Sequence, residues 1–332
     1  MKTKVESSKI KLKNGIYAIA GICKNCGKTS LMNSLLAQIK HKQAGVLTTG
    51  RDGEEKDVLY GNPKPAVKLR RDMLFTSTPD AVEKQRSAVE VLSKLPFHAA
   101  NKQLLLLKAL RDIETEITGP ASAADQIAVA SMMKKLGAEI VFIDGSLDRK
   151  SIVLNPKVNG VFIVVGSSYG SLEKIKAELS RLVRLSYIPR YMDKNLKAMQ
   201  DNVSVYKQDI WVRTGHATLM GHETEIASLL KQSVSDKLYL PGAVTDSMLT
   251  LLQPALRSVQ DLIVRHPLNL QLSPENLNSL FSNHRLTCLS KFVIVAIAVN
   301  SWSVKGSHLD SKILRDTIRR EFSALPVIDI YE

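Results

Sequence analysis

The sequence predicts an α/β fold: a mostly parallel β-sheet with helices on both faces, followed by a C-terminal α/β extension. Short apolar runs typical of buried strands alternate with longer segments of helical period. This alternation is the pattern of parallel sheets that helices cover on both sides. The first apolar run, at residues 15–20, turns through glycine into a helical pattern that opens at Lys28, which gives the strand–loop–helix order of such sheets.

Length and composition predict a globular protein outside the membrane. The 332 residues suffice for about two domains, and an apolar content of 44% supports a sizeable core. No stretch of about 18 apolar residues occurs. Residues 1–13 lack the apolar run of a secretory signal, and three cysteines are too few for a disulfide framework. We therefore expect a cytoplasmic protein.

The net charge of +14 favours an anionic partner such as a nucleotide, a nucleic acid or an acidic protein. The basic residues are scattered along the chain, and aromatic residues make up only 5% of it. Proteins that bind single strands interleave basic and aromatic residues, and this pattern is missing. We therefore expect no nucleic-acid partner.

Apolar and amphipathic segments predict strands and helices through the first half of the chain. Strands are expected at residues 15–20, 45–49, 73–76, 104–110, 139–144 and 160–165. The alternating residues 113–117 are expected to pair with 104–110. Helices are expected from Lys28 onward and at residues 81–95, 121–136 and 171–185. Pro79 precedes the second helix, Gly119-Pro120 breaks the chain before the third, and Gly137 ends it.

The periodic pattern weakens between residues 186 and 209. We therefore predict a nucleotide-binding domain at residues 1–190 and a C-terminal α/β subdomain at residues 191–332. Strands are expected at residues 210–212, 237–240, 261–264 and 291–299, and helices near residues 223–231, 245–256 and 308–322. The sequence leaves open whether this part forms a second α/β unit or extends the first sheet.

The segment from Gly21 to Ser30 has the parts of a phosphate-binding loop. Successive backbone N–H groups and the positive end of a helix bind phosphate, a lysine reaches the outer phosphates, and a hydroxyl binds magnesium. Lys28 and Thr29 supply that lysine and hydroxyl. The residues expected to contact the nucleotide are Gly21, Lys24, Asn25, Cys26, Gly27, Lys28, Thr29 and Ser30.

Five residues separate Gly21 from Gly27, one more than in the standard loop. The loop therefore resembles the longer variant of dethiobiotin-synthase-like P-loop proteins, which retains the final Gly-Lys-Thr. This resemblance implies a P-loop NTPase-like sheet.

Carboxylates at the ends of neighbouring strands are candidates for holding magnesium or positioning water. Asp144 closes the apolar run at residues 140–143 and is the expected magnesium ligand together with Thr29. Asp52, Glu54 and Asp57 follow the second strand, where Asp57 is a further metal candidate. We assign catalytic roles to Lys28, Asp144, Asp52 and Glu54. Arg51, Asp148 and Arg149 are expected to line the site, as is the loop at residues 118–122.

The cysteines and histidines give weaker signals. Cys23 and Cys26 have the spacing of a redox or metal motif, but zinc needs about four ligands. We interpret them as small residues of the phosphate loop, with redox sensing as the alternative. His216 and His222 are six positions apart and do not share a helical face, so we interpret both as structural.

An ordered set of motifs resembles a known family. The motifs are KNCGKTS at residues 24–30, TTGRDGEEKD at 48–57, YGNPKP at 60–65, EITGPAS at 116–122 and FIDGSLDRKS at 142–151. Together they resemble the lysine 5,6-aminomutase reactivase subunit family, P-loop proteins encoded beside adenosylcobalamin-dependent aminomutases. The resemblance covers about residues 15–170; a fainter likeness lies in VNSWSVKG at 299–306.

This resemblance implies a factor that uses a nucleotide to reactivate a cobalamin-dependent aminomutase, together with a MutS-like ATPase partner. It implies ATP and Mg²⁺ as cofactors, with GTP still open, and a nucleoside triphosphatase activity that is weak or stimulated by the partner. Two other functions stay open: a dethiobiotin-synthase-like ligase or kinase acting on a small molecule, and a module that binds nucleotide without hydrolysing it. Association as a homodimer also stays open.

Overall fold

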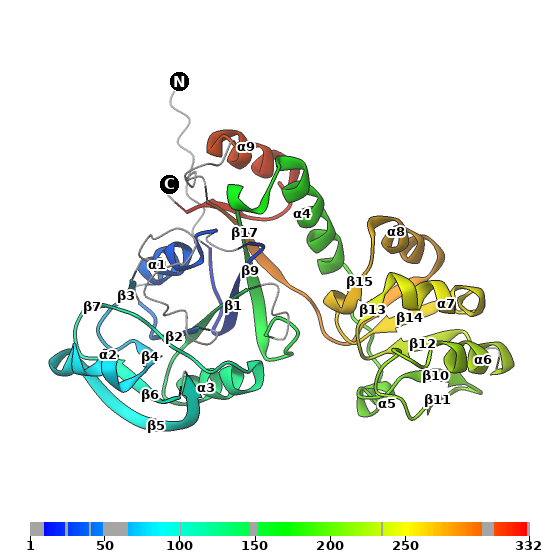
Figure 1. Cartoon of the computed structure of the whole chain (residues 1–332), viewed down its shortest axis with the longest axis horizontal. Coiled ribbons are helices and arrows are strands. Elements are labelled where there is room, and N and C mark those ends of the chain that lie inside the picture. The colour runs from blue at the N-terminus through cyan, green and yellow to red at the C-terminus, as the bar shows by residue number, and fades with distance from the viewer. Residues whose placement is uncertain are drawn as a thin grey trace. The chain divides into compact units, whose positions relative to one another are not determined.

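The computed structural model describes residues 10–23, 26–39, 41–48, 66–99, 101–146, 152–233, 235–300 and 309–330. The chain divides into two compact units (Figure 1). The first unit combines Met1–Ala177 with Val293–Glu332, and the second is Glu178–Phe292. No described helix is both long enough and apolar enough to cross a membrane.

A nine-stranded sheet forms the centre of the first unit within the described residues. In spatial order its strands are β18 (Val327–Asp329), β17 (Ile294–Asn300), β9 (Val158–Gly166), β1 (Gly15–Gly21), β8 (Ile140–Ser146), β2 (Ala44–Thr48), β4 (Leu74–Ser77), β6 (Lys102–Ala109) and β5 (Val89–Ala99). Neighbours are parallel except at β6, which is antiparallel to β4 and β5. The expected mostly parallel α/β sheet is confirmed.

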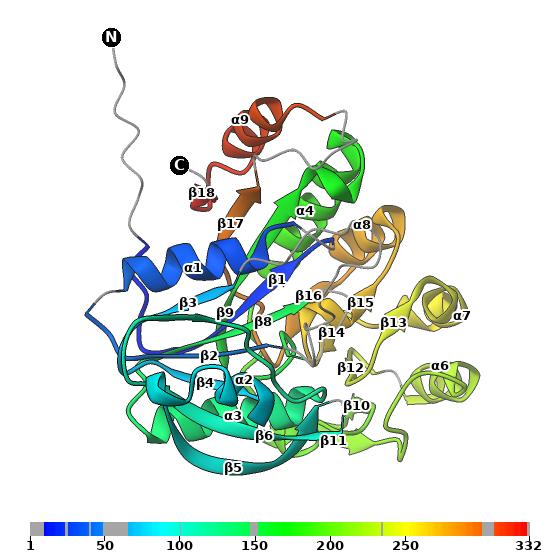
Figure 2. The same ribbon diagram turned by 60° about the vertical axis from the view of Figure 1, so that its left-hand side comes forward.

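Helices cover both faces of this sheet (Figure 2). The helices are α1 (Lys28–Gln38), α2 (Pro79–Glu83), α3 (Ala123–Lys135), α9 (Ser311–Glu321) and α4 (Leu172–Ser186), which crosses into the second unit. Leu31 and Leu35 of α1 pack in one buried cluster with Tyr17 and Phe142 of the sheet. Met133 of α3 lies on the opposite face, against Gly45. A two-stranded antiparallel ribbon, β3 (Val67–Leu69) with β7 (Ile113–Thr115), completes the extended structure.

Local sequence explains where α3 begins and ends. The Ser122 hydroxyl accepts a hydrogen bond of 3.1 Å from the Asp125 backbone N–H, which caps the first turn. Gly137 follows the helix with a φ of 100°, in the left-handed region that glycine adopts without strain. The helix predicted at residues 121–136 is therefore confirmed; Gly137 follows its end as predicted, and Ser122 caps its start.

The second unit contains a five-stranded sheet within its described residues. Its strands, in spatial order, are β11 (Ile210–Arg213), β10 (Ser204–Lys207), β12 (Lys237–Leu240), β14 (Asp261–Val264) and β16 (Arg285–Cys288). The other elements are α5 (Lys194–Ala198), α6 (Glu223–Ser233), α7 (Asp246–Leu256), α8 (Pro274–Asn283) and the short parallel pair β13 (Val244–Thr245) and β15 (Leu270–Gln271). β12, β14 and β16 are parallel, and β10 is antiparallel to both of its neighbours.

Two predictions about the first half of the chain are wrong. The helix expected at residues 81–95 is limited to α2, because the chain enters strand β5 at Val89. The segment at residues 113–117 does not pair with β6, since β7 pairs with β3 and β6 lies between β4 and β5.

The predicted division of the chain also differs from the structure. Residues 191–332 do not form one subdomain, because β17 pairs with β9 and so returns the last 40 residues, Val293–Glu332, to the first sheet. Both arrangements that the sequence left open therefore occur. Glu178–Phe292 is a second α/β unit, and the remainder extends the first sheet.

Candidate phosphate-binding site

The turn between β1 and α1 opens a helix N-terminus at the carboxyl edge of the sheet. Gly27 precedes α1 with a φ of 95°, a conformation that costs other residues about 1–2 kcal/mol. The N-cap residue Gly27 provides no side-chain cap for α1, and the first turn carries no acidic residue. The backbone N–H groups and the positive end of the helix dipole can therefore receive an anion.

Close packing fixes the path of this turn. A Cβ atom on Gly21 would lie 2.4 Å from Cys26 Sγ and 3.2 Å from Lys28 Cδ. The Lys28 side chain therefore lies back over the end of β1. A Cβ atom on Gly27 would lie 3.0 Å from Nδ2 of Asn300. Both positions thus require glycine, because side chains of the protein itself pack against the backbone of the turn.

Asp144 is buried on the sheet face that α1 covers. Its residue exposure is 4%, and its neighbours in register are Ile19 of β1 and Thr48 of β2. Side chains alternate along a strand, so Asp144 points to the same face as Phe142, which packs with α1. β8 continues to Ser146, so the prediction that Asp144 closes its strand is wrong by two residues. Gly145, the residue after Asp144, pairs with Ala20 as part of the ladder.

Thr48 lies beside Asp144 and is a site residue that the sequence did not single out. It is 2% exposed, and its Oγ1 is buried without a hydrogen-bond partner among the described residues. It shares the α1-facing side of β2 with Val46. Carboxylate and hydroxyl oxygens are ligands that Mg²⁺ prefers, so the residues present fit a magnesium ion held against phosphate.

The strand order places this site where ligands bind in open parallel sheets. From β1 the chain passes to β2 and then to β8 on one side, and afterwards to β9 and β17 on the other side (Figure 2). The order therefore reverses at β1. Ligands in such folds bind beyond the carboxyl ends of the strands at this reversal, which is where Gly21, Asp144 and α1 meet.

Asn300 is a second residue that the sequence analysis missed. It ends β17, is 6% exposed, and lies opposite Gly166 of β9 in register. Its Nδ2 faces Gly27, so a segment near the C-terminus supports the phosphate turn. The signal was present, because Asn300 follows the apolar run of β17 in the same way that Asp144 follows that of β8.

The loop at residues 118–122 lies against the end of β2. A Cβ atom on Gly119 would be 2.1 Å from the Thr48 carbonyl oxygen, so only glycine allows this approach. The Thr118 N–H donates to the Thr76 carbonyl at 2.9 Å. The loop at residues 118–122, which was expected to line the nucleotide site, is thus in contact with Thr48.

Two thiols flank the phosphate turn. The Cys23 Sγ lies 3.1 Å from the Ser168 hydroxyl. A hydrogen bond with the Cys26 thiol lowers the pKa of Cys23 to about 7, against the opposing effect of burial and with the help of Ser168 and the Lys28 charge. The same hydrogen bond and burial raise the pKa of Cys26. Cys23 is therefore the thiol that ionises near neutral pH.

Several predicted site residues lie outside the described parts of the chain. They are Lys24, Asn25, Arg51, Asp52, Glu54, Asp57, Asp148 and Arg149. Their roles stay predictions. Thr29 and Ser30, by contrast, lie in the first turn of α1 beside Lys28, where both are half-buried.

The chain was compared with known proteins. No protein-family model matches it. No curated protein matches its sequence.

Proposed function

We propose that the chain binds a nucleoside triphosphate with Mg²⁺ at the end of β1, in a P-loop NTPase-like site, and acts with it on a partner enzyme. One observation carries the nucleotide part of this proposal. The left-handed turn at Gly27, the Lys28 side chain over β1 and the buried Asp144 come together where the strand order reverses. The turn and the lysine suit a phosphate group, and the carboxylate suits the Mg²⁺ ion that accompanies it.

Different residues of the site bind the phosphate groups and the metal ion. The N–H groups at the start of α1 bind phosphate oxygens, and the Lys28 ammonium pairs with the outer phosphates. Thr29 and Asp144 hold Mg²⁺, with Thr48 beside them; the ion neutralises phosphate charge when bound. We propose ATP as the nucleotide, and GTP is the competitor that the binding experiment includes.

The identity of the partner rests on the motif resemblance alone. That resemblance leads us to propose a cobalamin-dependent aminomutase, together with a MutS-like ATPase, as the proteins on which nucleotide turnover acts. The five-residue spacing between Gly21 and Gly27 favours a second candidate, an ATP-dependent ligase or kinase of the dethiobiotin-synthase kind. This candidate predicts turnover that depends on a small organic acceptor instead of a protein.

Nucleotide binding by a Lys28→Ala variant tests the proposal. Loss of a charge-assisted contact costs about 1.5–3 kcal/mol, so affinity for MgATP should fall by roughly 10- to 100-fold. Titration calorimetry with ATP and GTP, each with and without Mg²⁺, measures this change. Lys312→Ala is the matched control, because Lys312 is an exposed lysine in the first turn of α9 in the same unit; its affinity should equal that of the wild type.

In the same titrations, the Asp144→Asn variant distinguishes the contribution of Mg²⁺ to nucleotide affinity from that of the phosphate contacts. This variant should lose the gain in affinity that Mg²⁺ gives the wild type, while its binding of metal-free nucleotide stays.

Hydrolysis that rises only with the mutase and its ATPase partner supports the reactivation proposal, whereas hydrolysis that rises only with an organic acceptor supports the ligase or kinase. Wild-type protein that binds neither ATP nor GTP refutes the nucleotide site.

A further inference from the structure

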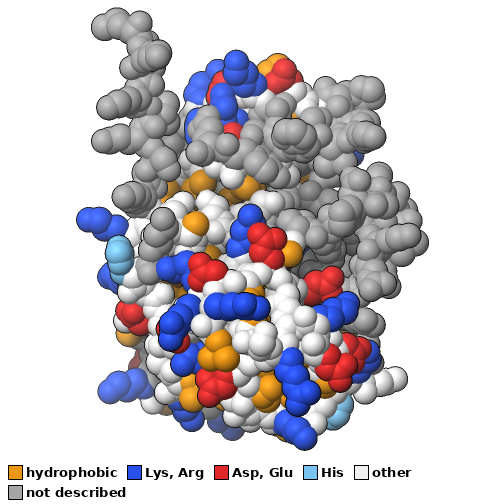
Figure 3. Space-filling view, turned by 90° about the vertical axis from the view of Figure 1, so that its left-hand side faces the viewer, with side chains coloured by type: hydrophobic (Ala, Val, Ile, Leu, Met, Phe, Trp, Pro, Cys, Tyr) orange, Lys and Arg blue, Asp and Glu red, His pale blue; other side chains and the backbone are white. Residues whose placement is uncertain are grey.

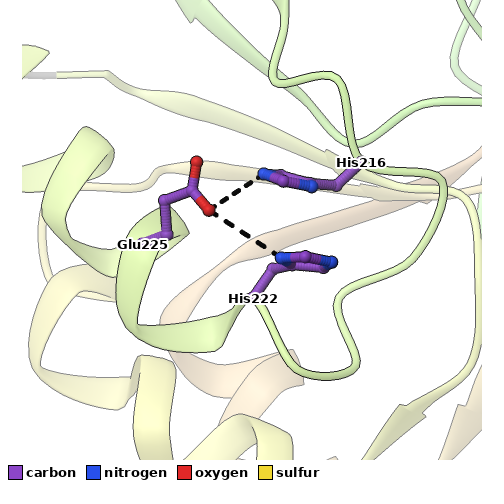
Figure 4. Close-up of side chains that lie close together, drawn as sticks. All are labelled: His216, His222 and Glu225. Carbon is purple, nitrogen blue, oxygen red and sulfur yellow. Dashed lines mark ion pairs between the residues drawn. The ribbon is translucent and has the colours of Figure 1, made fainter.

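Two histidines and a glutamate of the second unit converge at the start of α6 (Figure 4). His216 Nε2 lies 3.0 Å from Glu225 Oε2, and His222 Nδ1 lies 3.8 Å from the same oxygen. The two imidazole rings stack at a centroid distance of 3.7 Å with an interplanar angle of 18°. The two histidines do not share a helical face, as the sequence indicated, but a loop and a helix start bring them together.

The backbone of the loop before α6 explains how residues six apart meet. Gly215 and Gly221 flank the turn with φ values of 86° and 80°, and a Cβ on either would touch nothing within 4 Å. Their left-handed conformation, rather than lack of space, therefore requires glycine. Between them Leu219 is buried and anchors the loop. His222 and Glu225 are three positions apart at the helix start, where such residues are neighbours.

We propose that His216, His222 and Glu225 form a binding site for a divalent transition-metal ion, with Zn²⁺ as the expected occupant. Metal–ligand bonds of about 2.0–2.2 Å place two ligand atoms around a tetrahedral ion roughly 3.3 Å apart. The separations of 3.0 and 3.8 Å lie on either side of this value, and all three ligand atoms lie within 4.8 Å of one another. Among the described residues, these three form the group of potential metal-ligating side chains whose ligand atoms all lie so close together.

The contact between His216 and Glu225 is better suited to a shared ion than to a hydrogen bond. Nε2 of His216 is buried, and although Glu225 Oε2 is 3.0 Å away, no partner satisfies the angle of a hydrogen bond among the described residues. A buried nitrogen without a partner is costly. A metal ion bound in the plane of the ring would satisfy it, and the carboxylate already faces both rings (Figure 4).

The donor set selects the class of metal. Two imidazole nitrogens with one carboxylate suit Zn²⁺ and other first-row divalent ions, whereas Mg²⁺ and Ca²⁺ prefer oxygen ligands. His222 and Glu225 are partly exposed, with side-chain exposures of 39% and 56%, so water can complete the coordination. This exposure also lets the His222 ring rotate out of the stack, as binding in the plane of each imidazole requires. The ion would hold the 214–222 loop on α6.

Metal titration of the full-length chain tests this site. Zn²⁺ is titrated by calorimetry with excess Mg²⁺ present, and we expect tight binding of one ion at this site. His216→Ala, His222→Ala and Glu225→Gln should each weaken that binding by at least about tenfold. Glu223→Gln and His98→Ala are matched controls, since Glu223 lies in the same helical turn and His98 is an exposed histidine of β5; both should bind as the wild type does.

Substitution of Co²⁺ for Zn²⁺ identifies the ligands. Nitrogen and oxygen ligands give visible d–d bands without the thiolate charge-transfer bands that cysteine would add, so a spectrum without thiolate bands supports the site. Glu225 is largely exposed, so Glu225→Gln should remain folded and keep the test valid if a histidine variant does not fold. Wild-type protein that binds no Zn²⁺ at 100 µM, binding that survives all three ligand variants, or thiolate bands from Cys23 and Cys26 would overturn the proposal.

Discussion

The two thiols beside the phosphate turn share one hydrogen bond and respond to it in opposite ways. That bond lowers the pKa of Cys23 to about 7 and raises the pKa of Cys26, which burial raises further. Burial raises the pKa of Cys288, in the second unit, to about 11. Because the thiolate is the reactive form, the three cysteines should differ in reactivity at neutral pH.

Alkylation with iodoacetamide is expected to modify Cys23 first. Its rate should rise with pH through a midpoint near 7, because the thiolate forms as the pH passes the lowered pKa. Cys288 should stay unmodified over the same range. Peptide mass spectrometry measures each site, and MgATP should slow labelling of Cys23 if nucleotide occupies the turn. Equal labelling of Cys23 and Cys288 at pH 7 would contradict this account.

At the residue scale, local chemistry made part of the site predictable. Lys28 and Gly27 belong to a short motif whose spacing carries its own mechanism, and Asp144 ends an apolar run. Asn300 was missed because its relevance depends on β17 pairing with β9, a contact across more than a hundred residues. The stacking of His216 on His222 was not predicted, because the left-handed turns at Gly215 and Gly221 bring the two together and helical spacing cannot anticipate such turns.

At the element scale, buried segments were predicted well and the sheet edge was not. β12 and β14 have the predicted bounds because their residues are buried almost throughout. β5 was mistaken for part of a helix because it is the edge strand, mostly exposed, with register shifts after Val91 and Lys94. These irregularities break the two-residue alternation that indicates a strand.

The junction of β1 and α1 gives a prediction at this scale. Gly27→Ala should lower the free energy of unfolding by about 1–2 kcal/mol, because a φ of 95° is strained for alanine, and the added Cβ also meets Asn300. Gly137→Ala is the control, since Gly137 has a similar φ of 100° at the end of α3. Urea unfolding should show a comparable loss for both variants, and calorimetry should show reduced nucleotide affinity for Gly27→Ala alone. Unchanged nucleotide affinity in Gly27→Ala would separate the turn from phosphate binding.

At the scale of the whole molecule, the second unit is inserted into the first. The chain leaves the first sheet after β9, builds the second unit, and returns as β17. On the face of the protein in Figure 3, basic and acidic side chains are interspersed among the described residues, as on an ordinary solvated surface. The described residues on that face therefore do not form a broad basic patch.

Truncation after Phe292 should damage the first unit and spare the second. The shortened chain lacks β17, α9 and β18, so β9 loses one of its two neighbouring strands and Gly27 loses Asn300. Hydrogen exchange with mass spectrometry should show faster exchange in β9 and β1 than in the full chain, whereas β12 and β14 keep their protection. Unchanged exchange in β9 would mean that the sheet does not need its last strands.

The contact between Asn300 and Gly27 also has a consequence for biosynthesis. Ribosomes add about 5–20 residues per second, so β1 and α1 emerge long before the segment that carries Asn300. Until then the open edge of β9 has no neighbour, and an exposed strand edge invites wrong pairing and recruits chaperones. The nascent chain would therefore complete the packing around the Gly27 turn only when β17 has been made, and an unfinished product would lack the contact with Asn300.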